Sequence, residues 1–90
     1  MDITEVRIRR MSATQKMRAV ASVTFDNAIV IHDIKIIDGP DGPFIAMPSR
    51  RLPSGEFRDV AHPIHALMRQ RLEEAIFSAY EAASQEEMMR

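Results

Sequence analysis

Arginine is the residue type with the most distinctive placement in this 90-residue sequence. Arg50 and Arg51 are adjacent within a polar stretch bounded by Pro48 and Pro53, and Arg58 follows a few residues later. The planar guanidinium group can donate paired hydrogen bonds to phosphates and to base edges. The cluster is compatible with a nucleic-acid-binding loop over residues 48–55. The charge pattern alone favours the alternative, a solvated loop whose arginines form salt bridges.

A second basic group lies near the N-terminus, where Arg7, Arg9 and Arg10 project from an expected strand. Residues 1–58 carry nine Lys and Arg against seven Asp and Glu, whereas residues 59–90 carry three against six. The net charge of −1 argues against a nonspecific nucleic-acid coat protein. Its uneven distribution places a basic surface, if one exists, in the first two thirds of the chain.

Asp59, His62 and His65 recur every three residues and are residue types that bind zinc. This spacing crosses the end of an expected strand, a proline and the start of an expected helix, so the side chains need not converge. We favour a structural role, in which Asp59 or His62 caps the helix by accepting a hydrogen bond from a backbone amide. No metal and no cofactor are predicted.

Catalytic signals are weak throughout the sequence. There is no cysteine, and Ser49 and Ser54 are not part of a recognisable nucleophile motif. The glycines of the segment 38–43 lack the spacing of a phosphate-binding loop. We therefore expect neither an enzyme nor a small-molecule substrate.

Hydrophobic periodicity predicts an α+β domain, with an antiparallel sheet of about five strands followed by one C-terminal helix. The expected turns lie at residues 11–15, 26–27 and 38–43. The expected domain covers residues 1–83, and a short, acidic, flexible tail covers residues 84–90. The expected strands are 3–10, 17–25, 28–37, 44–47 and 57–61, and the expected helix is 66–83.

The segment 28–37 is the most apolar part of the chain. Strict alternation would place its apolar residues on both faces, with Ile29, Ile31 and Ile37 on one side and Val30, Ile34 and Ile36 on the other. One helix covers only one face of a sheet, so we expect a second copy of the chain to cover the other. This predicts a homodimer; a sheet that coils over itself is the alternative.

The N-terminus shows no signal peptide, because Asp2 and Glu5 interrupt it before an apolar stretch forms. The longest aliphatic run, residues 28–31, is far shorter than the roughly 20 residues of a membrane-spanning helix. We expect a cytoplasmic protein without a membrane partner.

Three collinear motifs resemble the SpoVG family of bacterial septation and stage V sporulation proteins. Residues 31–39, IHDIKIIDG, resemble the family's VHDIRVIDG block. Residues 42–51, GPFIAMPSRR, resemble G-x-F-V-A-M-P-S-K/R-R, and residues 52–64, LPSGEFRDVAHPI, are similar to TPDGEFRDITHPI. The resemblance extends from about Ile3 to Tyr80. Among the departures, His65 replaces the family's Asn after H-P-I.

The resemblance implies a cytoplasmic, homodimeric regulator of septation, sporulation or gene expression. It implies that the chain binds DNA, with RNA as a second candidate ligand, through the paired basic residues that correspond to Arg50 and Arg51. We add Arg58, Arg7 and Arg9 to this site from their placement in the sequence. The near-zero net charge favours the alternative, a protein–protein adaptor of the division or sporulation machinery that does not bind nucleic acid.

Overall fold

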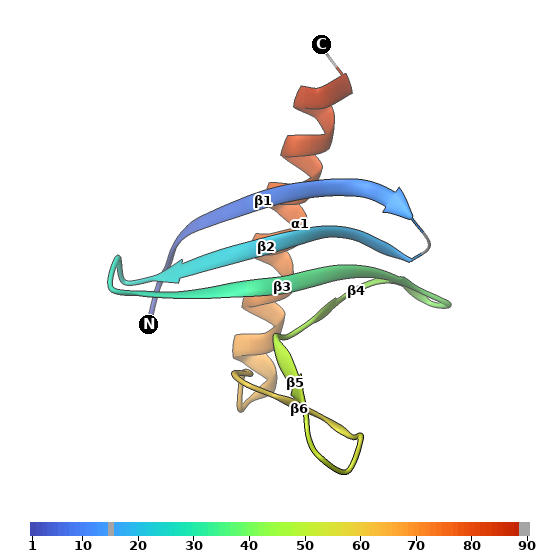
Figure 1. Cartoon of the computed structure of the whole chain (residues 1–90). Coiled ribbons are helices and arrows are strands. Elements are labelled where there is room, and N and C mark those ends of the chain that lie inside the picture. The colour runs from blue at the N-terminus through green and yellow to red at the C-terminus, as the bar shows by residue number, and fades with distance from the viewer. Residues whose placement is uncertain (15, 89–90) are drawn as a thin grey trace.

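The computed structural model describes the backbone of residues 1–14 and 16–88 and the side chains of residues 1–9 and 16–86. Four strands form one antiparallel sheet in the order β1-β2-β3-β4, and two further strands form a separate hairpin (Figure 1). The elements are β1 (Ile3–Thr14), β2 (Met17–Phe25), β3 (Ile29–Gly39), β4 (Gly42–Ala46), β5 (Ser49–Arg51), β6 (Phe57–Asp59) and α1 (Ala66–Met88).

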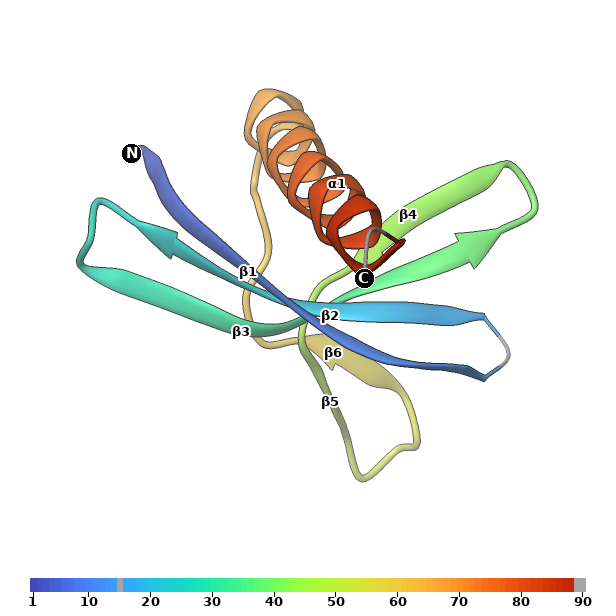
Figure 2. The same cartoon turned by 90° about the horizontal axis from the view of Figure 1, so that it is seen from above.

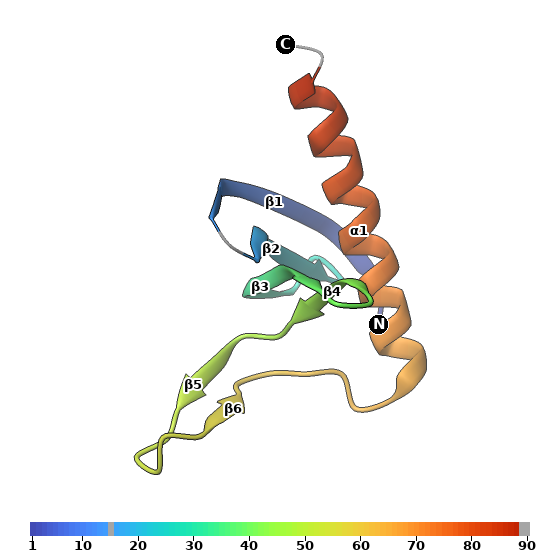
Figure 3. The same ribbon diagram turned by 90° about the vertical axis from the view of Figure 1, so that its right-hand side faces the viewer.

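The α+β class and the antiparallel sheet followed by a helix are as predicted, but the strands fall into two sheets. Helix α1 packs against one face of the four-stranded sheet, and the β5–β6 hairpin projects from the opposite side (Figures 2 and 3). The expected strand 57–61 is therefore not a fifth strand of the main sheet. Its first three residues pair with β5 instead.

The core lies between α1 and the sheet face that it covers. Leu72 and Ile76 of α1 are buried against alternate residues of β2, which point inward as the periodicity predicts. Burying each of these aliphatic side chains contributes about 1.5–3 kcal/mol. The inward residues of β2 are Ala19, Ala21, Val23 and Phe25.

A β-bulge in β3 overturns the predicted alternation of segment 28–37. Val23 pairs with Ile31 and Ala21 pairs with Ile34, so that His32 and Asp33 together oppose Ser22. Asp33 adopts a φ of 63°. The extra residue shifts the pleat by one position.

The bulge changes which residues share a face. Ile31 before it and Ile34 and Ile36 after it all pack into the core under α1. The strand is therefore not apolar on both faces in the way that strict alternation requires. The arrangement of β3 therefore does not by itself require a second chain to cover the other face of the sheet.

Other boundaries also differ from the prediction. Strand β3 extends to Gly39 and β4 covers Gly42–Ala46, so the turn expected at 38–43 is confined to residues 40 and 41. Strand β1 continues through residues 11–14, which were expected to form a turn, and Gln15 lies outside the described residues. Helix α1 begins at Ala66 as predicted but continues beyond Ala83 to Met88, so residues 84–88 of the expected tail are helical.

The predicted turn at Asp26 and Asn27 is present. Their φ values of 51° and 50° are those of a tight hairpin turn with two left-handed residues. Within the described part of the chain, no helix is long and apolar enough to cross a membrane.

Candidate nucleic-acid interface

The candidate site is the β5–β6 hairpin, which contains Arg50, Arg51 and Arg58. At its base, the amide of Val60 donates to the carbonyl of Pro48 at 2.7 Å, and near its tip the amide of Leu52 donates to the carbonyl of Glu56 at 2.7 Å. The segment 48–55 is therefore not simply a loop, since Arg50 and Arg51 lie in a strand. Strand pairing holds their backbone in a defined register.

A tight turn closes the hairpin at residues 52–55. The amide of Gly55 donates to the carbonyl of Leu52 at 2.9 Å, and Gly55 has a φ of 93°. Pro53 supplies the fixed φ that favours the second position of such a turn, and glycine accepts the positive φ without steric cost. Pro53 and Gly55, which are typical of loops, therefore form the turn at the tip of the hairpin.

The register distributes the site residues over the two faces of the hairpin. Directly paired residues share a face of an antiparallel ladder. One face therefore carries Arg50 with Arg58, and the other carries Arg51 with Phe57, followed by Ser49 with Asp59. All six side chains are exposed.

Arg50 and Arg58 are an unfavourable pair for the fold alone, because like charges directly opposite each other destabilise a ladder. The guanidinium groups of Arg50, Arg51 and Arg58 form no hydrogen bond or ion pair with any residue that the structure describes. These arginines are exposed, as the alternative of a solvated loop also expects, but they form no salt bridge with a described residue. Three cationic groups on a short ribbon are available to an anion.

Other arginines have partners. Arg18 donates to Asp38 with a separation of 2.5 Å, and its hydrogen bonds to Asp38 and Tyr80 raise the pKa of its guanidinium. Arg71 approaches Asp2 at 4.0 Å and donates to the carbonyl of Met1 at 3.2 Å. Arg18 thereby connects β2 with β3 and α1, and Arg71 connects α1 with the residues that precede β1, so both arginines have structural roles.

Arg7 and Arg9 lie on the sheet face opposite α1. In the β1–β2 ladder they pair with Ser22 and Val20. They line an open groove of about 750 Å³, and Arg7 forms an exposed ion pair with Glu5 at 3.4 Å. The hairpin projects from the same side of the molecule (Figures 2 and 3). Arg7 and Arg9 form a separate group on the main sheet, and the side chain of Arg10 lies outside the described part.

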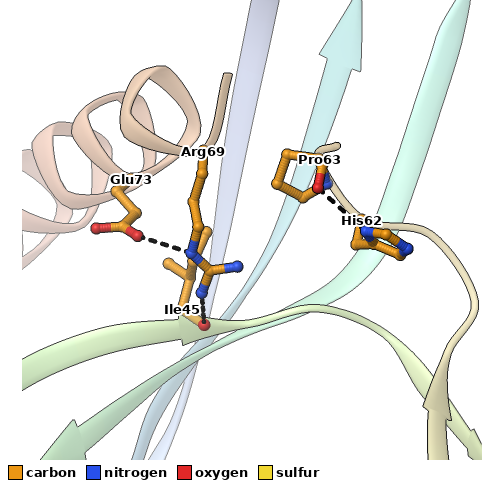
Figure 4. A network of polar contacts seen from close by, with 5 residues as sticks. All are labelled: Ile45, His62, Pro63, Arg69 and Glu73. Carbon is orange, nitrogen blue, oxygen red and sulfur yellow. Dashed lines mark hydrogen bonds and ion pairs between the residues drawn. The ribbon is translucent and has the colours of Figure 1, made fainter. Parts of the chain in front are cut away.

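The three candidate metal ligands have separate surroundings. Asp59 lies in β6 opposite Ser49, and Nδ1 of His62 is 3.0 Å from the carbonyl oxygen of Pro63 (Figure 4). His65 caps α1, since its Nδ1 accepts a hydrogen bond from the amide of Met68 at 3.0 Å. Among the described residues, no three His, Cys, Asp or Glu side chains form a metal-binding group.

The capping prediction chose the wrong residue. Neither Asp59 nor His62 reaches the amides of the first turn, and His65 does so because it directly precedes the first helical residue. The accepting Nδ1 places the proton of the neutral imidazole on Nε2. Its position before a helical run was the signal in the sequence.

Arg69 fixes the base of the hairpin and was not identified from the sequence. Its Nη2 donates to the carbonyl of Ile45 in β4 at 3.1 Å, and its Nε donates to Glu73 at 3.1 Å (Figure 4). Ile45 and Met47 are both buried. Helix α1 therefore holds the chain shortly before β5 begins.

The fold and the site define a small α+β domain from which an arginine-bearing β-ribbon projects. A profile of the SpoVG family matches residues 1–82, and the chain belongs to that family. The family is not one of enzymes.

The chain is similar over nearly its whole length to curated proteins with the name "Putative septation protein SpoVG". It is 57% identical to that of Clostridium novyi (strain NT), over 96% of this chain and 86% of the relative. It is 56% identical to that of Thermoanaerobacter pseudethanolicus, over 97% of this chain and 95% of the relative. The relative in Alkaliphilus oremlandii is 57% identical, over 93% and 90% of the two chains.

Proposed function

We propose that this chain is a septation regulator of the SpoVG type that binds nucleic acid through the β5–β6 hairpin. DNA is the first candidate ligand and RNA the second. The observation that carries the proposal is the direct pairing of Arg50 with Arg58 on an exposed ribbon, where no described residue neutralises either charge. An arrangement that disfavours the free hairpin is stabilised when phosphates lie between or beside the guanidinium groups.

We further propose that the protein acts as a homodimer. Helix α1 covers one face of the main sheet, and the other face carries Val30 and Phe44 with substantial exposure. Two copies would present two ribbons, and linked weak sites bind far more tightly than either alone. Light scattering should give twice the 10.2 kDa of one chain, and a mass of one chain at micromolar concentration would contradict the dimer.

The proposed function is tested by a salt titration of binding to a labelled 20-base-pair DNA and to an RNA of the same length. The double variant Arg50→Gln/Arg58→Gln should bind at least about tenfold more weakly to the favoured ligand. The slope of log K against log salt should become shallower by about 0.7–0.9 for each phosphate that the variant no longer neutralises.

The control is Lys16→Gln/Lys35→Gln, which makes the same change in net charge on β3 and on the β1–β2 connection. It should bind nearly as the wild type does. Equal losses of affinity in both double variants would mean that net charge, not the hairpin, determines binding. Unchanged binding by the arginine variant would contradict the assignment of the hairpin.

A protein–protein adaptor is the second candidate, and a specific observation favours it. Val60, Ile64 and Leu67 lie between β6 and the first turn of α1 and are 67%, 88% and 64% exposed. Three large apolar side chains in one exposed segment are typical of a protein contact. If the protein binds neither DNA nor RNA at physiological salt, and Ile64→Ser disrupts a complex with a division protein, the adaptor function is the better one.

A further inference from the structure

Phe57 is a large apolar residue of the hairpin, and its exposure to solvent is not explained by a role in binding phosphates. Its side chain is 72% exposed although phenylalanine usually contributes to a core. The hairpin projects away from the main sheet and from α1 (Figure 3), and the ring of Phe57 remains largely in solvent. A phosphate-binding ribbon alone has no use for an exposed aromatic ring.

Charged residues adjoin Phe57 in the ladder and in the chain. Arg51 is its direct partner across the ladder, and Glu56 and Arg58 are its neighbours in the chain. The Arg51 guanidinium extends toward the tip, 3.8 Å from the position that a Cβ on Gly55 would take. One face of the ribbon thus combines a flat apolar ring with a planar cation.

We propose that Phe57 is a stacking platform for an unpaired base, and that the ligand of the hairpin is a single-stranded nucleic acid. The inference rests on the proposed function and names the class of its ligand. An aromatic ring can stack only on a base whose face is accessible. In a duplex, neighbouring base pairs cover those faces.

The two faces of the hairpin contact different parts of the nucleic acid. Arg51, on the same face as Phe57, lies beside the stacked base and contacts it or its phosphate. Arg50 and Arg58, on the other face, bind phosphates as the nucleic-acid strand passes the edge of the ribbon. Aromatic side chains interleaved with arginines are the general chemistry by which proteins hold single strands.

A protein partner fits the surroundings of Phe57 less well. The cores of protein interfaces are depleted in charged residues, whereas Arg51 and Asp59 lie on the same face of the ribbon as this ring. The exposed apolar side chains of Val60, Ile64 and Leu67 are better suited to such a partner. The two surfaces can therefore be tested separately.

The test compares anisotropy titrations with three labelled probes: oligo(dT) and oligo(U) of 20 nucleotides, and a 20-base-pair DNA duplex. Wild-type protein should bind at least one single strand more tightly than the duplex. Phe57→Leu keeps an apolar side chain but removes the aromatic face, and should lose about fivefold to one hundredfold in affinity for that strand. Phe57→Tyr keeps the stacking face and should bind like the wild type.

The salt dependence separates stacking from charge. Phe57→Leu should leave the slope of log K against log salt unchanged, because the same phosphates remain neutralised by the arginines. Arg51→Gln should make that slope shallower. An equally shallow slope in both variants would overturn the assignment of Phe57 to stacking.

A direct readout is available because the chain contains no tryptophan. In Phe57→Trp the new indole is the only one, and its emission should be quenched when oligo(dT) or oligo(U) binds. An abasic 20-mer, with the same phosphates but no bases, should bind more weakly and leave the emission unchanged. Equal quenching by the abasic strand would contradict stacking on a base.

The possible failures are distinguishable. If wild type binds the duplex more tightly and Phe57→Leu behaves as wild type on every probe, the stacking inference is overturned and the arginine site stands. If wild type binds none of the three probes, the proposed function fails together with the inference.

Discussion

Arg50 and Arg58 face each other directly across the β5–β6 ladder, and neither has a counterion among the described residues. Selection for stability alone disfavours this pairing, because it places two guanidinium groups on one face of a short ribbon. Under the proposed function, this pairing should lower the stability of the free hairpin and strengthen the binding of phosphates.

We expect Arg58→Thr to stabilise the hairpin and weaken nucleic-acid binding. Removing the like-charge pair and adding a β-branched residue should favour the closed ribbon by about 0.2–1 kcal/mol. Because the hairpin does not pack on the core, its opening is best followed by hydrogen exchange of the Val60 amide, which bonds to Pro48. Exchange should slow by up to about fivefold.

Arg58→Lys is the matched control for this change. It retains the opposed positive charges, so amide exchange should stay near the wild-type rate. Faster exchange in Arg58→Thr than in wild type would show that the arginine pair supports the ribbon in a way that electrostatics does not predict.

Gly55 offers a way to disturb the hairpin without touching an arginine. Its φ of 93° is strained for any residue with a side chain, although the nearest atom to an added Cβ is 3.8 Å away. Gly55→Ala should therefore destabilise the turn through its backbone by about 1 kcal/mol or more, and it should lower nucleic-acid affinity.

Gly42→Ala provides the comparison, since Gly42 has a φ of 114° and open space around it but is the first residue of β4, directly after the β3–β4 turn. Denaturation should show a similar or larger loss of global stability for Gly42→Ala, without a specific loss of affinity at temperatures where the protein is folded. An equal loss of affinity in both variants would argue against a special role of the hairpin.

The β-bulge in β3 is visible in the sequence, but a strict alternation of apolar and polar residues does not detect it. The apolar residues change from odd to even positions between Ile31 and Ile34, and that change is the signature of the bulge at Asp33. Alternation that is assessed over eight or ten positions does not locate a single inserted residue. For this reason the two-faced strand and the resulting dimer argument were misleading.

The candidate site was predictable in its residues but not in its geometry. Arg50 and Arg51 were identified from their spacing, yet strand β5 has no apolar alternation because its three residues are exposed and the hairpin projects away from the main sheet. Periodicity detects strands through the surface that they bury, so an unsupported ribbon resembles a loop in sequence. The significance of Phe57 depends on its exposure, which only the three-dimensional arrangement reveals.

The bulge can be tested through the backbone of Asp33. Its φ of 63° is tolerated by Asp, costs nothing for Gly and is unfavourable for β-branched residues. Urea denaturation should show Asp33→Gly within about 0.5 kcal/mol of wild type, and Asp33→Val less stable by about 1–2 kcal/mol. Lys35→Val, in a regular part of the same strand, should cost little, and equal costs for the two valine variants would contradict the bulge.

The helix cap at His65 gives an independent prediction. His65→Ala removes the acceptor for the Met68 amide and should lower the free energy of unfolding by about 1 kcal/mol. His65→Asn replaces one acceptor with another and should restore or exceed wild-type stability. If the alanine and asparagine variants unfold at the same denaturant concentration, the imidazole does not act as the cap.

Arg69 should couple the stability of the domain to the position of the hairpin. Arg69→Met keeps an apolar stem but leaves the carbonyl of buried Ile45 without the donor that lies 3.1 Å away. The loss of this charge-assisted hydrogen bond should lower the free energy of unfolding by about 1.5–3 kcal/mol. Glu73→Gln weakens only the exposed ion pair on the helix surface and should cost no more than about 0.5 kcal/mol, so denaturation of the two variants separates the contributions.

Because Ile45 lies shortly before β5, Arg69→Met should also speed exchange of the Val60 amide at the base of the hairpin, whereas Glu73→Gln should not. If both variants lose equal stability, Arg69 supports the helix surface rather than the junction between α1, β4 and the hairpin.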